Sequence, residues 1–171
     1  MIKASVSKFL HRFSILKAGG HSSFFSVEPC LPTESVCMGR PGTSPPFFYM
    51  YSCLFSDLHV SLPFDSFTMD ILQTLNVAST QLHPNTWASI QAFRLLCDVL
   101  RFHPSHSSFV SYYTSHPANH VLWHSLIGRS GYVLFNSFAT SYKKFKERFV
   151  KVCIRPEATA YFFDRSRFPL Y

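Results

Sequence analysis

The chain has 171 residues, of which 47% are hydrophobic, 17% aromatic and only 15% charged. This length suits one folded domain better than two, and the composition excludes intrinsic disorder along the whole chain. The formal net charge is +7, and residues 99–171 hold ten basic against three acidic groups, so an anionic partner is expected to bind in that part of the chain.

The cysteine pattern favours a reduced compartment. The five cysteines are odd in number and lack any C-x-x-C spacing, which argues against a disulfide framework and against a zinc finger. They are Cys30, Cys37, Cys53, Cys97 and Cys153. No run is long and apolar enough for a transmembrane helix, and no secretory signal follows the start. We therefore expect an intracellular protein of the nucleus or cytoplasm.

The first predicted element is an amphipathic helix over residues 2–17, within an N-terminal segment of residues 1–20. Its apolar residues recur at helical spacing, and Gly19 and Gly20 end it. The segment holds four basic and no acidic residues, a composition shared by organelle transit peptides and membrane-surface helices. A packed terminal helix is the simpler interpretation.

Residues 21–46 contain seven prolines and glycines, which predicts a loop or linker. The aromatic segment FFYMYSCLF at 47–55 fits a buried strand or a short helix equally well. Residues 47–171 are predicted to form a single domain.

Two helices, at 66–76 and 86–101, are the best-defined elements of that domain. The first follows an Asp65 cap, and its apolar residues share one face. The second is apolar around most of its circumference, so it is expected to be the buried centre of the core. Its one polar stripe predicts a solvated face, on which Arg94 and Asp98 can pair at i, i+4. The stripe consists of Gln91, Arg94, Asp98 and Arg101.

Shorter elements follow in alternating runs. The pattern predicts a helix at 106–114, a hairpin of 123–127 and 132–135 around a Gly128–Gly131 turn, a helix from Ser137 to Phe149, a strand containing Val150, Val152 and Ile154, and a last hairpin of 161–164 and 167–171. Helices and antiparallel strands in separate runs predict an α+β fold, with a central buried helix, several shorter helices and antiparallel hairpins.

Several motifs stand in order along the chain. SLPF begins at residue 61, QLHPNTW leads into the helix at 86–101, and AFRLLC lies inside that helix. WHSLIGRSG, SYKKFKERF and FFDRSRFPLY follow, the last ending at Tyr171. From about Phe24 to Tyr171 this order resembles the gypsy-type transposon domain family of plants.

The resemblance implies a domain of transposon-derived reading frames that is called a transposase by name, with no catalytic residues to carry over. FFDRSRFPLY departs from the family, because its turn is shorter than the usual acidic, glycine-containing one. The chain also stops where the family continues with tryptophan. The resemblance therefore implies a domain truncated at its C-terminus.

The acidic residues do not suggest a catalytic centre. A transposase needs carboxylates that converge on two metal ions, whereas Asp65 and Asp70 on one predicted helix point about 140° apart. No polymerase, aspartic-protease or P-loop motif occurs in the sequence. We predict no catalytic residues, no cofactor and no small-molecule substrate, and a mobile-element enzyme is the least favoured alternative.

Histidine spacings of three and four can hold zinc on a helix or tight turn. Pro104 and Pro117 interrupt the run, however, and no cysteine or acid joins it, so solvated loop residues are predicted instead of metal ligands. The five histidines are His103, His106, His116, His120 and His124. Cys97 lies on the apolar arc of the core helix and is predicted to be a packed hydrophobe, not a nucleophile.

One basic cluster is the sharpest candidate binding site: Lys143, Lys144, Lys146, Arg148 and Lys151. The interleaved aromatics recur at helical period, so a solvated helix face is the simpler interpretation and a salt-dependent nucleic-acid surface is the alternative. The leading hypothesis is a noncatalytic interaction or gag-like structural domain that self-associates. Its motivation is the family likeness together with the low content of charge.

Overall fold

The computed structural model of the protein describes residues 24–31, 33–34, 36, 46–117, 124–131, 134–135, 142 and 144–158. The chain forms two compact units, the first from 1–63 with 143–170 and the second mainly from 64–142. The single domain predicted for 47–171 draws on both units, so its boundaries stay a prediction. The helix predicted for 2–17 and the hairpin predicted for 161–171 lie outside the described residues.

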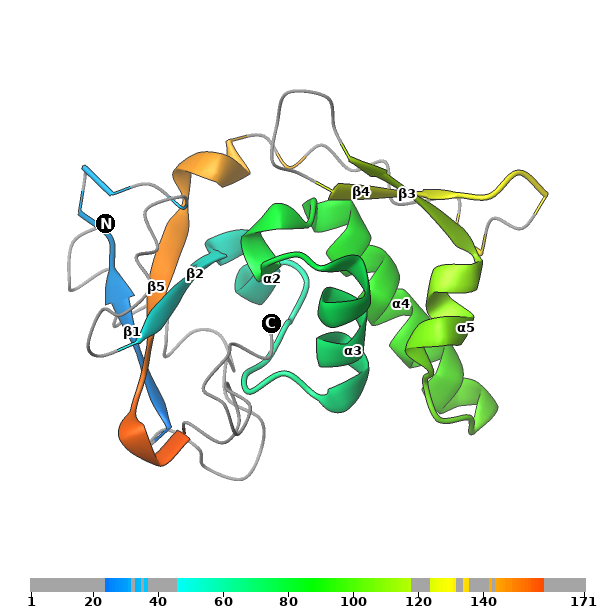
Figure 1. The fold of residues 1–171 in the computed structure, drawn as a ribbon, viewed down its shortest axis with the longest axis horizontal. Coiled ribbons are helices and arrows are strands. Elements are labelled where there is room, and N and C mark those ends of the chain that lie inside the picture. The colour runs from blue at the N-terminus through cyan, green and yellow to red at the C-terminus, as the bar shows by residue number, and fades with distance from the viewer. Residues whose placement is uncertain are drawn as a thin grey trace. The chain divides into compact units, whose positions relative to one another are not determined.

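The first unit contains a three-stranded antiparallel sheet with β5 in the middle (Figure 1). Its strands are β1 (Phe25–Pro29), β2 (Phe47–Tyr51) and β5 (Phe149–Ile154). Val152 of β5 lies between Val27 of β1 and Phe48 of β2. The alternation predicted for Val150, Val152 and Ile154 is confirmed, because all three side chains are buried.

Strand β1 corrects the prediction of a loop over 21–46. Phe25 and Val27 alternate on the buried face of the sheet. The first breaker of the segment is Pro29, which stands at the last position of an edge strand, where proline is tolerated. The density of prolines further along therefore does not prevent pairing here.

The segment 47–55 adopts both of the structures left open for it. Strand β2 runs directly into the short helix α2 (Ser52–Ser56). The Ser52 backbone N–H and hydroxyl donate to the carbonyl of Arg148, at 2.9 and 2.8 Å, and the rings of Tyr51 and Phe145 meet edge to face at 4.9 Å. These contacts fix the start of α2 to the chain that leads into β5.

The helix predicted from Ser137 is wrong at its C-terminal end. Phe145–Glu147 forms a single 3-10 turn, η3, and Phe149 already belongs to β5. The Arg148 N–H bonds to the carbonyl of Phe145 at 3.1 Å, which is the shorter 3-10 spacing. Because the Arg148 carbonyl is taken by Ser52, a continuing helix would lose that contact. Residues 136–141 lie outside the described residues.

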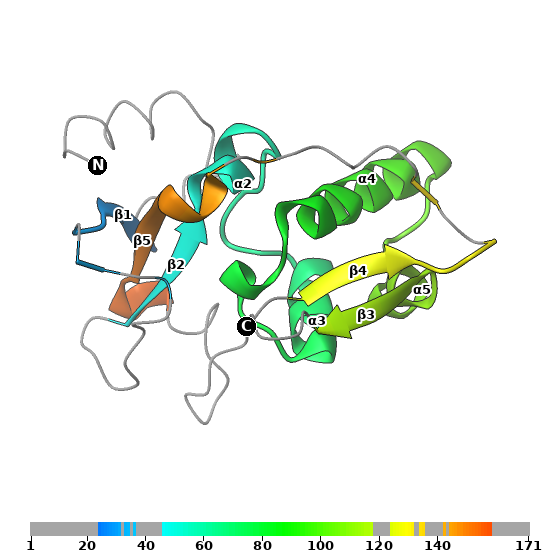
Figure 2. The same cartoon turned by 90° about the horizontal axis from the view of Figure 1, so that it is seen from above.

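The second unit holds the longer helices and a two-stranded antiparallel hairpin, seen side by side in Figure 2. Its elements are α3 (Ser66–Leu75), η2 (Ser79–Gln81), α4 (Pro84–Leu100), α5 (His106–Ser111), β3 (Tyr113–Pro117) and β4 (His124–Gly128). Helices and antiparallel strands thus occur in separate runs, and the predicted α+β class is confirmed.

Both long helices begin at residues whose side chains cap them. The Asp65 carboxylate accepts a hydrogen bond from the Thr68 N–H at 3.0 Å at the start of α3. His83 caps α4, with Nδ1 accepting from the Asn85 N–H at 3.1 Å, and Pro84 takes the first helical position, where a missing N–H costs nothing. The helices predicted at 66–76 and 86–101 are therefore confirmed, the second starting two residues earlier.

The core of the second unit is built on α4. Trp87 is 1% exposed, and its indole N–H donates to the carbonyl of Ser79 at 3.1 Å. Phe93 stacks on Phe67 of α3 at 5.7 Å and meets Phe109 of α5 edge to face at 5.4 Å. Burial of these rings holds the three helices together, since large apolar side chains contribute most of the folding energy.

The polar stripe of α4 makes a different ion pair from the one predicted. Arg94 does not pair with Asp98. Its guanidinium binds the Asp65 carboxylate at 3.0 Å and the Thr68 hydroxyl at 2.6 Å, and it lies over the ring of Phe67. The arginine therefore joins α4 to the capped start of α3 in place of a solvated i, i+4 pair.

The predicted partner of strand β4 is also wrong. β4 pairs with β3, in the register Tyr113↔Gly128, and residues 134–135 are not in a strand. Helix α5 ends at Ser111, and Tyr113 then turns into the core, where its ring lies 4.8 Å from that of Phe109. The sequence pattern predicts a helix that continues to residue 114. The backbone becomes extended at Tyr113 instead, because this conformation buries the tyrosine ring.

Candidate functional site

The described acidic residues that form ion pairs do so with separate basic partners. Asp65 binds Arg94, Asp70 lies 3.4 Å from His106, and Glu34 binds Lys151. Asp65 and Asp70 therefore serve different contacts, as their helical spacing predicts. Among the described residues, no three histidine, cysteine or acidic side chains stand close enough to hold a metal ion. Asp164 lies outside the described residues.

The histidine run is spread over several elements. His106 begins α5 and pairs with Asp70, whereas His103 is exposed in the preceding loop. The β3–β4 register places His116 opposite Ser125, and the carbonyl of His124 accepts from the His83 N–H at 3.2 Å. His120 lies outside the described residues.

The described cysteines are poor nucleophiles at neutral pH. Burial raises the pKa of Cys30 and of Cys153 to about 11 each, and the pKa of Cys53 to about 12. Cys97 packs in the core at 8% exposure, and burial raises the pKa of its thiol as well. A thiol that stays protonated does not attack an electrophile, which fits the predicted packing role of Cys97.

The basic cluster has two kinds of member. Lys144, Lys146 and Arg148 are exposed on and around the η3 turn. Lys151 belongs to strand β5, and its ammonium binds Glu34 and lies 4.8 Å from the ring centre of Phe47. Lys143 lies outside the described residues. Nucleic-acid binding by the cluster stays a prediction.

The Glu34–Lys151 pair is the most enclosed ion pair among the described residues, with side chains 16% and 18% exposed. Burial acts to raise the pKa of Glu34, but hydrogen bonds from Lys151 and from the Leu31 N–H outweigh it, so that pKa lies below 4.5. The hydrogen bond to Glu34 holds the pKa of Lys151 above 10.5. Both charges are therefore stabilised in the folded state.

The substitution Glu34→Gln is expected to lower the free energy of unfolding by about 1–3 kcal/mol near neutral pH, because it leaves the Lys151 ammonium without its carboxylate. A lowered carboxyl pKa stabilises the fold above its unfolded value, and this stabilisation disappears as the pH falls through the folded pKa. A raised lysine pKa stabilises the fold below its unfolded value, and this part disappears at strongly alkaline pH. The difference in unfolding free energy between the wild type and Glu34→Gln should thus reach its largest value between about pH 5 and pH 10.

Urea unfolding of the wild type and of Glu34→Gln across this pH range measures the effect. The exposed Glu147→Gln variant is the matched control, and its unfolding should follow the wild type. A difference that stays constant from neutral to acid pH would show that the pair contributes nothing through its charges.

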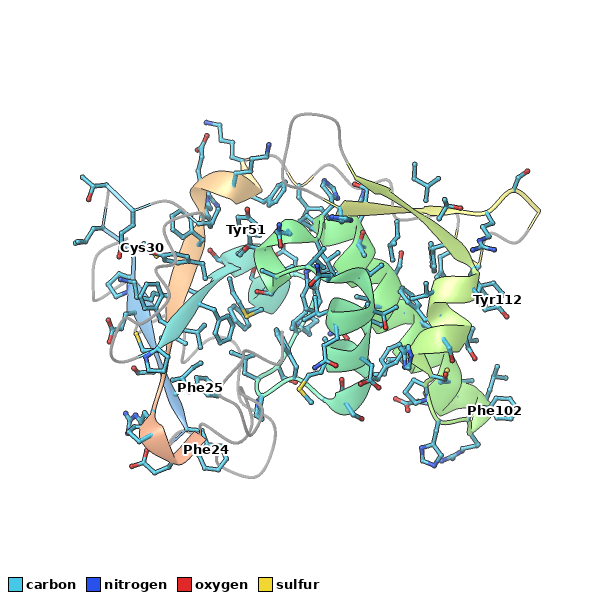
Figure 3. All side chains as sticks on the ribbon, in the orientation of Figure 1. Phe24, Phe25, Cys30, Tyr51, Phe102 and Tyr112 are labelled. Atoms are coloured by element: carbon cyan, nitrogen blue, oxygen red, sulfur yellow. The ribbon has the colours of Figure 1, made fainter. Side chains whose placement is uncertain are left out.

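An exposed apolar surface lies at the C-terminal end of α4. Leu95, Val99 and Leu100 on the last turns are 64%, 69% and 53% exposed, and Phe102 just beyond them is 68% exposed. Figure 3 shows Phe102 at this end of the helix. We call these four residues the α4 apolar face. The burial predicted for the apolar side chains of this helix is confirmed for most of them from Pro84 to Phe93 and is wrong here.

These features define a class: a small α+β protein with a capped core helix, one apolar face of which is exposed. Residues 48–117 match the model of the family described as "Putative gypsy type transposon". The resemblance is confirmed over these residues, which include α4 and its apolar face. The motifs beyond Pro117 lie outside the match, and their likeness stays a prediction.

No curated protein and no solved structure matches the chain. In the part of the chain that the structure describes, none of the helices combines the length and apolarity that crossing a bilayer requires.

Proposed function

We propose that the chain is a noncatalytic, transposon-derived interaction domain that associates with copies of itself. The observation that carries this proposal is the α4 apolar face. Four large apolar side chains, each more than half exposed, lie close together in sequence on the last turns of α4 and just beyond its end. Contiguous apolar patches on soluble monomers often mark interaction sites.

The polar groups around the core support a binding role over a catalytic one. Arg94, which could have served an exposed anion site, is committed to Asp65 and Thr68. Lys151 is committed to Glu34. The described cysteines carry raised thiol pKa values. Among the described residues, the feature that a binding partner would stabilise most is therefore the exposed apolar surface at the end of α4.

The size of the face indicates weak association. Fully burying one large apolar side chain stabilises a complex by roughly 1.5–3 kcal/mol, whereas association costs about 4–15 kcal/mol in lost freedom. Four partly exposed side chains from each of two copies exceed that cost by a modest margin. We expect a dimer with a dissociation constant on the order of micromolar to hundreds of micromolar.

Sedimentation velocity over a concentration series tests the proposal. The weight-average sedimentation coefficient of the wild type should rise from the monomer value to the dimer value between about 1 µM and 1 mM. A coefficient that stays at the monomer value throughout this range would contradict self-association.

A further inference from the structure

The basic cluster concentrates its exposed charge on one turn of the first unit. Between Lys144 and Arg155 the sequence has five basic residues and one acidic residue, Glu147. Lys151 is neutralised by Glu34, in an ion pair whose side chains are 18% and 16% exposed, and Arg155 stands beyond the far end of β5. The exposed cations that stand close together are Lys144, Lys146 and Arg148, which we call the η3 basic turn.

Hydrogen bonds fix the backbone of the η3 basic turn. The Glu147 N–H donates to the carbonyl of Lys144 at 3.1 Å. The Arg148 N–H donates to the carbonyl of Phe145, also at 3.1 Å, and the Phe145 ring is buried. The Arg148 carbonyl in turn accepts from the N–H and the hydroxyl of Ser52. The cationic side chains therefore extend from a backbone that has little freedom left to lose when they bind a ligand.

The backbone conformation does not favour lysine at position 144. Lys144 is left-handed, with φ 59°. Glycine adopts this conformation without a steric cost, whereas a residue that carries a Cβ atom is disfavoured in it. The presence of lysine here therefore points to a role for its exposed ammonium group and not for the geometry of the turn.

The side chains of the turn fit the phosphate groups of a nucleic-acid backbone. Lysine and arginine supply many of the contacts that proteins make to such phosphates. Between Lys144 and Arg155 every phenylalanine, valine and isoleucine is buried or half-buried. This segment therefore offers neither an exposed ring on which a base could stack nor an apolar side chain that could insert into a membrane surface.

We infer that the η3 basic turn binds the phosphate backbone of a nucleic-acid duplex without reading its sequence. Three cations that contact phosphates release about three counterions, so the logarithm of the association constant should fall against the logarithm of the salt concentration with a slope of about −2.7. This slope weakens binding roughly fortyfold between about 50 and 200 mM salt. The inference uses a surface of the first unit and does not depend on self-association through the α4 apolar face.

Fluorescence anisotropy of a labelled, mixed-sequence DNA duplex, titrated with the full chain over a salt series, tests the inference. Lys146→Gln and Lys144→Gly should each reduce the magnitude of the slope by about 0.9. Lys144→Gly should unfold at about the same urea concentration as the wild type, because relief of the left-handed strain offsets the freedom that glycine adds to the unfolded chain. Glu147→Gln removes the one negative charge of the turn and should tighten binding about threefold at low salt.

Arg155→Gln is the matched control, since it removes one exposed positive charge from the far end of β5. It should keep the affinity and the salt slope of the wild type. Absence of duplex binding at low salt, or a slope unchanged in Lys146→Gln and Lys144→Gly, would overturn the inference. An equal loss in Arg155→Gln would assign the binding to net charge and overturn it too. Tighter binding to vesicles of phosphatidylserine and phosphatidylcholine than to the duplex would show that the turn serves a membrane surface instead.

Discussion

The substitution Val99→Asp is expected to abolish self-association while leaving the fold intact. Val99 is 69% exposed at the centre of the α4 apolar face, so the folded monomer loses little apolar contact there. In the proposed dimer the same carboxylate would be buried against the other copy, and an unpaired buried charge costs several kcal/mol. The dissociation constant should rise by at least about a hundredfold, as measured by sedimentation velocity.

Ile127→Asp is the matched control for this prediction. Ile127 is also an exposed apolar residue of the second unit, at 54%, but it lies on strand β4. The control should dimerise like the wild type, and circular dichroism should show both variants folded. If the control dissociates and Val99→Asp does not, the interface lies on the hairpin and not on α4.

The substitution Trp87→Ala is expected to lower the free energy of unfolding by about 3–5 kcal/mol, the range found for large core aromatics. Trp87 is 1% exposed, packs against Phe64 and bonds to the Ser79 carbonyl. Its removal leaves a cavity at the N-terminal half of α4 and removes the hydrogen bond to the Ser79 carbonyl. A small domain has only about 5–15 kcal/mol of stability, so the variant should be close to unfolding at ambient temperature.

Chemical denaturation followed by far-UV circular dichroism measures this loss. Trp87→Phe is the companion variant: it keeps most of the buried ring and loses the hydrogen bond, so it should cost clearly less than the alanine. A loss below about 1 kcal/mol for Trp87→Ala would mean that α4 is not the centre of the core.

The sequence predicted those elements whose signals are local. The Asp65 cap and the apolar period of residues 66–76 depend only on neighbours along the chain, and α3 formed as predicted. The apolar pattern that predicted the helix at 86–101 and the alternation of β5 are local in the same sense. Caps and periodicities need no knowledge of the tertiary partners.

The elements that were wrong depend on distant partners. Strand β1 is stabilised by pairing with β5, which lies more than a hundred residues away in the sequence. The residues at 21–46 carry no local signal that predicts this partner. The chain at Tyr113 leaves the helix because its ring fits beside Phe109. Tertiary burial of this kind routinely overrides local propensity.

The candidate interaction face was missed for a related reason. A helix that is apolar around most of its circumference is normally buried, and periodicity cannot tell a core contact from a contact with another molecule. The signal available in the sequence was the number of apolar residues on α4, which exceeds what one buried face requires. Only the structure shows that Leu95, Val99 and Leu100 lie outside the core.

For the basic cluster, the sequence grouped residues that the structure places in different environments. Spacing alone grouped Lys151 with Lys144, Lys146 and Arg148, because these basic residues stand within a few positions of one another. The strand that starts at Phe149 separates them, and the pairing of Lys151 with Glu34 bridges positions far apart in the chain. Such a long-range ion pair has no signature in the local sequence.

Hydroxyl-radical footprinting, read residue by residue by mass spectrometry, tests most directly whether a second copy covers the α4 apolar face. Samples are labelled well below and well above the dissociation constant. Labelling of Leu95, Val99, Leu100 and Phe102 should fall at the higher concentration, while that of the exposed Leu31 and Ile127 stays constant. Equal labelling of the α4 apolar face in monomer and associated protein would contradict the proposed interface.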